Sequence, residues 1–284
     1  MSLKEMLRQK RAIIVPGASN ALTARVITDL GFEAIYVTGA GVTNMSLGLP
    51  DLSFVDLTQM VQQTLAIRNA TGLPLVVDAD TGFGNAVNVT HTVRMLEQAG
   101  ANAIQIEDQT LPKRCGHFDG KELIAPEEMA GKVKAAVDAR RSEDLLIIAR
   151  TDARSTEGIQ AALDRAAQYV AAGADVTFVE APENEDEIRR IPQALSVPQI
   201  INLVVGGRTP ILDQAALQQM GFAMVLYANV ALQGAVLGMQ NALRALAAGG
   251  RMDEASAITA SFAERQRLVQ KDHFDELERR YAAL

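Results

Sequence analysis

The sequence predicts one α/β domain, a (β/α)8 barrel of TIM type that spans residues 1–284 and carries a C-terminal helical segment over 229–284. Short apolar runs recur eight times along the chain, and each is followed by a turn and then a helical pattern. Continuous apolar runs are typical of parallel strands that are buried on both faces. Eight strands with helices between them are the count of such a barrel.

The eight predicted strands are Ala12–Val15, Ala34–Val37, Leu75–Val77, Ala103–Ile106, Leu145–Ala149, Val176–Val179, Gln199–Ile201 and Ala223–Leu226. The clearest predicted helices between them are Thr58–Ala70, Val87–Ala99, Pro126–Ala139, Gly158–Ala172 and Glu185–Ala194. Several end in glycine, which commonly terminates helices. An open doubly wound sheet is the rival fold. We favour the barrel, because no Gly-x-Gly-x-x-Gly follows the first strand and no Walker-type motif occurs.

From about Asn229 the pattern is purely helical, with predicted helices at Val230–Ala248, Glu254–Ala263 and Phe274–Tyr281. This is more helix than one barrel needs to close. The excess either packs on a neighbouring subunit or caps the same barrel. We expect a homo-oligomer.

Composition excludes several classes of protein. The net charge of −7 argues against a nucleic-acid partner, which requires a basic face. A single cysteine excludes an intramolecular disulfide, and Met1–Arg11 lacks the apolar core of a secretory signal, so we expect a cytoplasmic protein. Gln214–Leu243 has no charged residue, but glutamine, asparagine and glycine interrupt it too often for a membrane span.

Polar residues follow the predicted strands. They are Thr38 and Gly39, Asp78 and Asp80, Glu107 and Asp108, Arg150 and Asp152, Glu180, and Asn202. Barrels carry their catalytic groups at the carboxyl ends of the strands, so these residues are expected at one rim. Converging carboxylates repel unless a cation neutralises them, and an all-oxygen set suits Mg²⁺ or Mn²⁺. The alternative is that the acids cap the following helices.

Individual roles follow from side-chain chemistry. Asp78 and Asp80 lie two apart on an expected extended segment and should point the same way. Arg150 is the natural clamp for a substrate carboxylate, because its guanidinium offers two parallel donors. Asn202 and Thr38 can add neutral hydrogen bonds.

A polar loop follows the fourth predicted strand and carries Lys113, Arg114, Cys115, His117 and Lys121 within nine positions. Cationic neighbours favour the thiolate, so the pKa of Cys115 should be lowered. Two glycines in the loop would let it move over a ligand as a lid. The alternative is a solvated surface loop with an inert thiol.

Five segments together carry a family resemblance: Gly48–Asp51, Val77–Gly84, Ile106–Gln109, Lys113–His117 and Ala149–Asp152. In this order they resemble the isocitrate lyase/phosphoenolpyruvate mutase superfamily, over about Leu7 to Ala248. The Lys-Arg-Cys-Gly-His sequence is similar to that of the lyase branch, which includes 2-methylisocitrate, 2,3-dimethylmalate and isocitrate lyases.

The resemblance implies a Mg²⁺-containing barrel with a gating loop and a helix exchanged between the subunits of a dimer or tetramer. It implies that Asp78 binds Mg²⁺ directly and that Asp51, Asp80 and Glu107 act through water. It assigns Tyr36, Thr38, Gly39, Arg150, Glu180 and Asn202 to the substrate. It assigns proton transfer to Cys115, beside Lys113 and His117.

Two positions depart from the methylisocitrate lyase pattern. Gln105 replaces a histidine, and Phe118 replaces an arginine. An apolar residue at position 118 suits a smaller or more alkylated diacid than a tricarboxylate.

The predicted activity is retro-aldol cleavage of a 2-hydroxy di- or tricarboxylate to a 2-oxo acid and a carboxylate, with Mg²⁺. The alternatives are decarboxylation or hydrolysis of oxaloacetate, or a carboxyphosphonate or phosphoenolpyruvate mutase reaction, at the same site. A Schiff-base aldolase would need a buried lysine, and no predicted strand contains one. A protein that used the barrel only for binding or as a scaffold would not need the acidic residues at the strand ends or the loop that carries Cys115.

Overall fold

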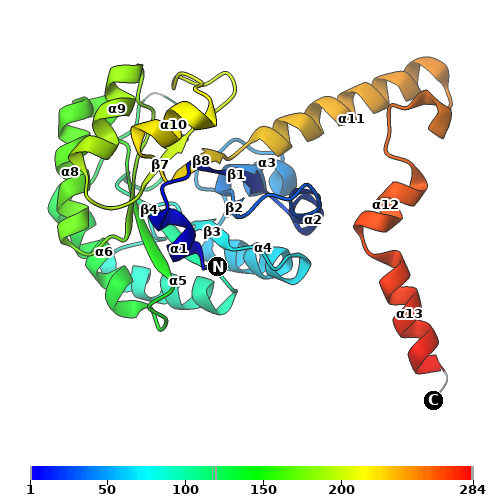
Figure 1. Ribbon diagram of the computed structural model, residues 1–284, viewed down its shortest axis with the longest axis horizontal. Coiled ribbons are helices and arrows are strands. Elements are labelled where there is room, and N and C mark those ends of the chain that lie inside the picture. Colours follow the sequence, from blue (N-terminus) through cyan, green and yellow to red (C-terminus); the bar gives the residue numbers. More distant parts are fainter. Residues whose placement is uncertain (1, 117, 119, 283–284) are drawn as a thin grey trace.

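The computed structural model describes residues 2–116, 118 and 120–282 and confirms the predicted barrel (Figure 1). Its strands are β1 (Ile13–Ala18), β2 (Ile35–Val37), β3 (Leu75–Asp78), β4 (Ala103–Glu107), β5 (Leu146–Thr151), β6 (Val176–Val179), β7 (Gln199–Asn202) and β8 (Met224–Tyr227). Each strand pairs in parallel with the next, and β8 pairs with β1, which closes the barrel. Closure brings the carboxyl ends of all eight strands to one rim.

Helices surround the barrel. They are α1 (Leu3–Arg8), α2 (Ala21–Asp29), α3 (Gly39–Leu47), α4 (Leu57–Ala70), α5 (Ala86–Gln98), α6 (Pro126–Ala139), α7 (Arg154–Glu157), α8 (Ile159–Ala171), α9 (Glu185–Ala194) and α10 (Gln214–Met220). Several begin at an Asn or Asp whose side chain accepts a hydrogen bond from a backbone N–H of the first turn. Asn20, Asp56, Asn85, Asn184 and Asp213 do so. Such caps fix where each helix begins after its strand.

The core has two layers. Inward side chains of the strands, such as Ile13, Val76 and Phe178, form one buried cluster inside the barrel. Leu3 and Leu7 of α1 belong to the same cluster, so this first helix covers the amino-terminal end of the barrel. Two further clusters fill the space between strands and surrounding helices. The barrel is therefore closed by packing at one end, and its functional rim is the other.

After β8 the chain leaves the barrel as an arm made of α11 (Val230–Gly249), a 3₁₀ turn η1 (Glu254–Ser256), α12 (Phe262–Leu268) and α13 (Lys271–Ala282). The predicted helix at Glu254–Ala263 is wrong. Ala257 has a left-handed φ of 55°, which ends the 3₁₀ turn, and Ser261 starts a new helix by accepting a hydrogen bond from the Glu264 N–H.

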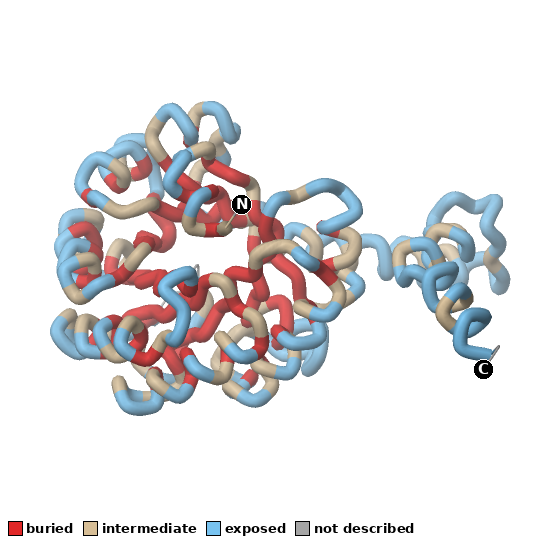
Figure 2. The backbone as a smooth tube through the Cα atoms, turned by 60° about the horizontal axis from the view of Figure 1, so that its bottom comes forward, coloured by how far each residue is buried: buried red, intermediate tan, exposed pale blue. Residues whose placement is uncertain are grey.

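The arm extends to one side of the barrel, and its residues are exposed or half-buried (Figures 1 and 2). None of the described residues in α11, α12 or α13 is buried. Arg267 of α12 reaches back to the barrel and pairs with both carboxylate oxygens of Asp29, at 2.7 Å each. Within residues 2–116, 118 and 120–282, no helix has both the length and the apolar character of a membrane span.

Candidate active site

A cavity of about 490 Å³ opens at the carboxyl ends of the strands. Nine of the sequence-predicted site residues line it: Tyr36, Thr38, Asp51, Asp78, Lys113, Cys115, Arg150, Glu180 and Asn202. Three more, Gly39, Asp80 and Glu107, contact these residues from behind the cavity wall. His117, the remaining predicted residue, lies outside the described residues. Closure of the barrel therefore brings together, at the carboxyl ends of the strands, side chains that are far apart in the sequence.

Asp78 ends β3 and projects into the cavity. Its carboxylate accepts three long hydrogen bonds of 3.3 Å, from the N–H groups of Gly39 and Asp80 and from Nε2 of Gln105. A Cβ atom on Gly39 would lie 3.1 Å from Oδ2 of Asp78 and 3.4 Å from Oδ1 of Asp80. A larger residue here would crowd the Asp78 carboxylate, so glycine lets the backbone approach both carboxylates closely.

The segment that carries Asp80 is not extended, contrary to our prediction. Its φ of 46° lies in the left-handed region, and β3 has already ended at Asp78. The turn is held from outside, because Lys132 of α6 donates a hydrogen bond to the Thr81 carbonyl at 3.2 Å. The two aspartates thus converge because the chain turns, and not because they share a strand face.

Lys113 places a positive charge beside the acidic cluster at the rim, which consists of Asp51, Asp78, Asp80 and Glu107. Its Nζ atom lies 2.6 Å from Oδ1 of Asp51 and 3.1 Å from Oδ1 of Asp80. Burial opposes the ammonium form of Lys113, but the attraction of Asp80 and Asp51 outweighs it and raises the pKa of Lys113 well above its usual value. Burial also raises the pKa of Asp80 to about 7, against the opposing effect of Lys113.

The acidic cluster fits a hydrated divalent cation. Within the part of the chain that the structure describes, no three His, Cys, Asp or Glu side chains are grouped to hold a metal ion by themselves. However, Mg²⁺ commonly keeps several waters and binds through one or two carboxylates. The buried Oε1 atom of Glu107 has no hydrogen-bond partner among the described residues, so it can accept from such a water. Asp78 could bind the ion, with Asp51, Asp80 and Glu107 acting on its waters.

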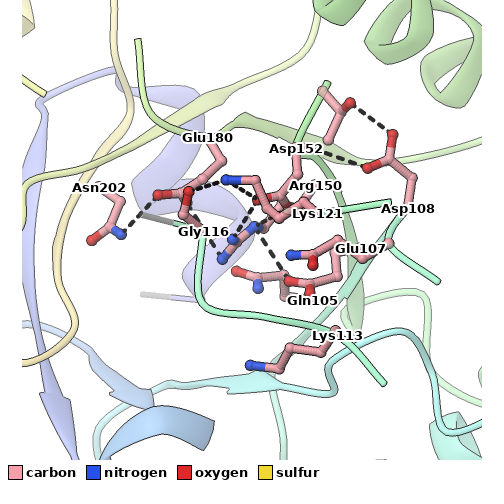
Figure 3. A network of polar contacts seen from close by, with 12 residues as sticks. Gln105, Glu107, Asp108, Lys113, Gly116, Lys121, Arg150, Asp152, Glu180 and Asn202 are labelled. Atoms are coloured by element: carbon pink, nitrogen blue, oxygen red, sulfur yellow. Dashed lines mark hydrogen bonds and ion pairs between the residues drawn. The ribbon is translucent and has the colours of Figure 1, made fainter. Parts of the chain in front are cut away.

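Arg150 of β5 is the centre of a second network (Figure 3). Its Nε and Nη2 atoms donate to the two carboxylate oxygens of Asp152, at 2.9 and 3.0 Å. Glu107 and Glu180 each approach the guanidinium to 3.3 Å. Burial raises the pKa of Glu107 well above its usual value, against the attraction of Arg150. Arg150 lines the cavity within this network, so its guanidinium is placed to attract a substrate carboxylate.

Gln105 also contributes to the site, although its place in the sequence does not predict a role for it. It is fully buried in β4, where its Oε1 accepts a hydrogen bond of 3.0 Å from the Tyr36 hydroxyl. Its Nε2 donates to Asp78, so one amide side chain orients both a candidate substrate ligand and the candidate metal ligand. The sequence feature that could have indicated this role is the presence of one polar residue in the otherwise apolar run Ala103–Ile106.

The described residues between Gln109 and Leu123, which include Cys115, form a flap over the rim. Its base is held like a pair of strands, because Gln109 and Leu123 form an antiparallel bridge and the Thr110 N–H donates to the Glu122 carbonyl at 2.8 Å. At its tip, a Cβ atom on Gly116 would lie only 2.3 Å from Nη2 of Arg150. Cys115 therefore lines the same cavity as Arg150 and Asp78.

Comparison with known proteins agrees with this geometry. A family model described as phosphoenolpyruvate phosphomutase matches residues 3–247. The chain belongs to the PEP mutase/isocitrate lyase superfamily. It is 44% identical to 2,3-dimethylmalate lyase of Eubacterium barkeri over 99% of this chain and 97% of that protein. It is 42% identical to 2-methylisocitrate lyase of Aeropyrum pernix, over 85% and 78% of the two chains.

Solved structures of the superfamily superpose closely on the chain. One of 2,3-dimethylmalate lyase gives a TM-score of 0.92 at 32% identity, covering 98% of this chain and 94% of that one. Oxaloacetate acetylhydrolase with 3,3-difluorooxalacetate gives 0.93 at 29% identity, over 99% and 96%. Phosphonopyruvate hydrolase with oxalate and Mg²⁺ gives 0.89 at 31% identity, over 99% and 98%. The curated relatives place this superfamily member among the carbon–carbon lyases.

Proposed function

We propose that this lyase cleaves an alkyl-substituted 2-hydroxy dicarboxylate, with Mg²⁺, to a 2-oxo acid and a carboxylate. The observation that carries the proposal is that the Cys115 thiol lines the same cavity as Asp78 and Arg150. A carboxylate for a cation, a guanidinium for an anion and a thiol for a proton are the three groups that retro-aldol cleavage requires. The similarity to 2,3-dimethylmalate lyase supports the substrate class.

Each residue of the site has its own role in the proposed reaction. Mg²⁺ bound at Asp78 would supply Lewis-acid stabilisation of negative charge on the substrate oxygens. The proton of the substrate's 2-hydroxyl group passes to a carboxylate of the acidic cluster, and C2 becomes the carbonyl carbon of the 2-oxo acid. The C2–C3 bond breaks, and its electron pair moves onto C3 and the attached carboxylate. Arg150 stabilises that charge, and Cys115 donates the proton that C3 receives. The closed flap excludes water from the carbanion.

The cavity wall favours a dicarboxylate over a tricarboxylate. Among the described lining residues the only cations are Lys113 and Arg150, and Lys113 is already paired with Asp51 and Asp80. The remaining wall includes Phe118, Val204 and Leu226, which suit alkyl groups. A third carboxylate at that wall would be desolvated without a partner, which is costly.

Competing chemistries are less well supported. A Schiff-base aldolase needs a neutral lysine, and Lys113 is buried but ion-paired with a raised pKa. Hydrolysis or decarboxylation of oxaloacetate uses the same acidic rim, and the similarity to oxaloacetate acetylhydrolase makes it the main alternative. A mutase reaction shares the rim as well, but the cysteine loop favours the lyase.

A product screen tests the proposal. The enzyme is incubated with Mg²⁺ and separately with 2,3-dimethylmalate, 2-methylisocitrate, isocitrate, malate and oxaloacetate, and pyruvate, glyoxylate and oxalate are measured. We expect pyruvate from an alkylated malate at the highest kcat/KM. Release of oxalate from oxaloacetate, without cleavage of any 2-hydroxy acid, would instead identify a hydrolase.

We also propose that the enzyme assembles as a homo-oligomer in which the arm packs on a second copy of the chain. Large apolar side chains are exposed along α11, namely Val236, Leu237, Met239, Leu243 and Leu246. Several exposed large apolar side chains on one helix are typical of a subunit interface. Sedimentation velocity of the full chain and of a Leu237→Glu, Leu243→Glu variant tests this. A wild-type monomer at micromolar concentration would exclude the assembly.

A further inference from the structure

Lys121 has no role in the proposed reaction, yet it is one of the most buried cations of the active-site region. It lies at the base of the flap, next to the residues whose backbones pair there, and is only 7% exposed. A buried ammonium group must be compensated by specific partners. Those partners indicate what the residue does.

The ammonium group of Lys121 joins the tip of the flap to the barrel (Figure 3). It donates a hydrogen bond to the carbonyl oxygen of Gly116, at the tip. It also lies 3.8 Å from Oδ1 of Asp152, which is 1% exposed. Asp152 is the residue that clamps Arg150 through two hydrogen bonds. Lys121 therefore contacts both the neighbour of Cys115 and the support of Arg150.

Asp152 is itself held rigidly. Its backbone N–H donates to Oδ1 of Asp108 at 2.9 Å, and Oδ2 of Asp108 accepts from Thr151 at 2.7 Å and from Tyr169 at 2.8 Å. Asp108 is fully buried, so this support belongs to the interior of the barrel. Lys121 thus links the flap to a part of the barrel that buried hydrogen bonds hold in place.

We propose that Lys121 is a positioning residue that holds Cys115 and Gly116 against Arg150 in the closed flap. An ammonium group with three donors can bind a carbonyl and a carboxylate at the same time, whereas a methionine side chain can donate to neither. Without it, the Gly116 carbonyl loses its link to Asp152, and the closed position loses its anchor. The catalytic consequence depends on the proposed lyase function, but the closure does not.

The single cysteine permits a direct test of closure. The rate of Cys115 alkylation by iodoacetamide is measured with and without saturating oxalate and Mg²⁺. In the wild type we expect the two ligands to slow alkylation by about 10-fold, within the usual range of coupling between a ligand and a conformational change. In Lys121→Met, which keeps the apolar stem and removes the charge, we expect most of this protection to disappear.

Matched controls separate positioning from general damage. Lys134→Met removes a lysine that pairs with Asp138 on the exposed face of α6, so it should retain full protection. Lys121→Arg keeps a charged donor and should regain part of the protection. If Lys121→Met does not fold, Lys121→Gln removes the same charge but keeps a polar side chain at this position.

Turnover gives the second readout. With a substrate found in the product screen, we expect kcat of Lys121→Met to fall by about 10²-fold, the usual effect of a small misplacement of a catalytic group. KM should change little, because Arg150 and Asp78 remain. Equal ligand protection of Cys115 in Lys121→Met and wild type would overturn the inference, as would no protection in the wild type. Failure of every 2-hydroxy acid as a substrate would remove the lyase proposal and leave the alkylation result standing.

Discussion

The Nζ atom of Lys113 lies 2.6 Å from Oδ1 of Asp51, although the two residues are 62 positions apart in the sequence. Lys113 belongs to the flap, whereas Asp51 belongs to the segment between α3 and α4. The flap therefore brings its own cation into the acidic rim when it is closed. Opening the flap would withdraw that charge, so cation binding and flap closure should be coupled.

We expect turnover to require a divalent cation at this rim. Asp78→Ala should reduce activity to background, because it removes the carboxylate that lines the cavity and is proposed to bind the cation. Asp138→Ala, at an exposed aspartate of α6, is the control and should behave as wild type. Steady-state rates and thermal unfolding are measured for both variants. Full activity after dialysis against excess chelator would refute the metal site.

Trypsin should report the opening of the flap. Lys113 is only 4% exposed, so cleavage after it requires the flap to open locally. Oxalate with Mg²⁺ should slow cleavage after Lys113 or Arg114, while cleavage after the exposed Arg251 in the arm should be unaffected and serves as the internal reference. Fragments are quantified by mass spectrometry over time. If the ligands do not change the rate of cleavage after Lys113 or Arg114 relative to cleavage after Arg251, the loop does not act as a lid.

Cys115→Ser should lower kcat by about 10²-fold or more, the usual range for removing a general acid. The serine hydroxyl has nearly the same size, but its much higher pKa makes it a poor exchanger of protons near neutral pH. Binding of Mg²⁺ and oxalate, measured by calorimetry, should be retained. Cleavage of a malate-type substrate at a near wild-type rate would show that the thiol is not the proton donor.

Phe118→Arg should shift the substrate preference. It places a cation at the apolar wall of the cavity, where the extra carboxylate of a tricarboxylate would lie. We expect kcat/KM for 2-methylisocitrate to rise relative to 2,3-dimethylmalate by about tenfold, the value of one charge-assisted hydrogen bond. Phe118→Leu is the control, because it shortens the wall without adding charge. A preference that does not differ between the two variants would contradict the assigned role.

Gly17→Ala should destabilise the barrel where β1 meets the end of β8. A Cβ atom at Gly17 would lie 1.9 Å from the carbonyl oxygen of Ala228, and a backbone group cannot move aside. We expect the free energy of unfolding to fall by about 3 kcal/mol, the upper end of the cost of overpacking. Gly72→Ala is the matched control, since nothing lies within 4 Å of its added Cβ. Chemical denaturation of both variants measures the difference.

The sequence by itself determined the barrel and most of the rim. Apolar runs mark the strands locally, and closure then places the residues that end them at one edge, so Asp78, Glu107, Arg150, Glu180 and Asn202 could be located without coordinates. Because an apolar run is a local property of the sequence, eight strands could be identified one at a time. The helix predicted at Glu254–Ala263 failed because a cap at Ser261 overrides the weak periodicity around it.

Only the tertiary structure determined which side chains at the rim form ion pairs and hydrogen bonds with one another. The ion pairs of Lys113, the link from Lys121 to Asp152, and the bridge of Gln105 between Tyr36 and Asp78 join residues whose spacing carries no periodic signal. Such contacts depend on side-chain reach once the barrel has closed and the flap has folded over it. Local patterns specify which residues reach the rim, whereas the pairing of charges there is a long-range property of the closed fold.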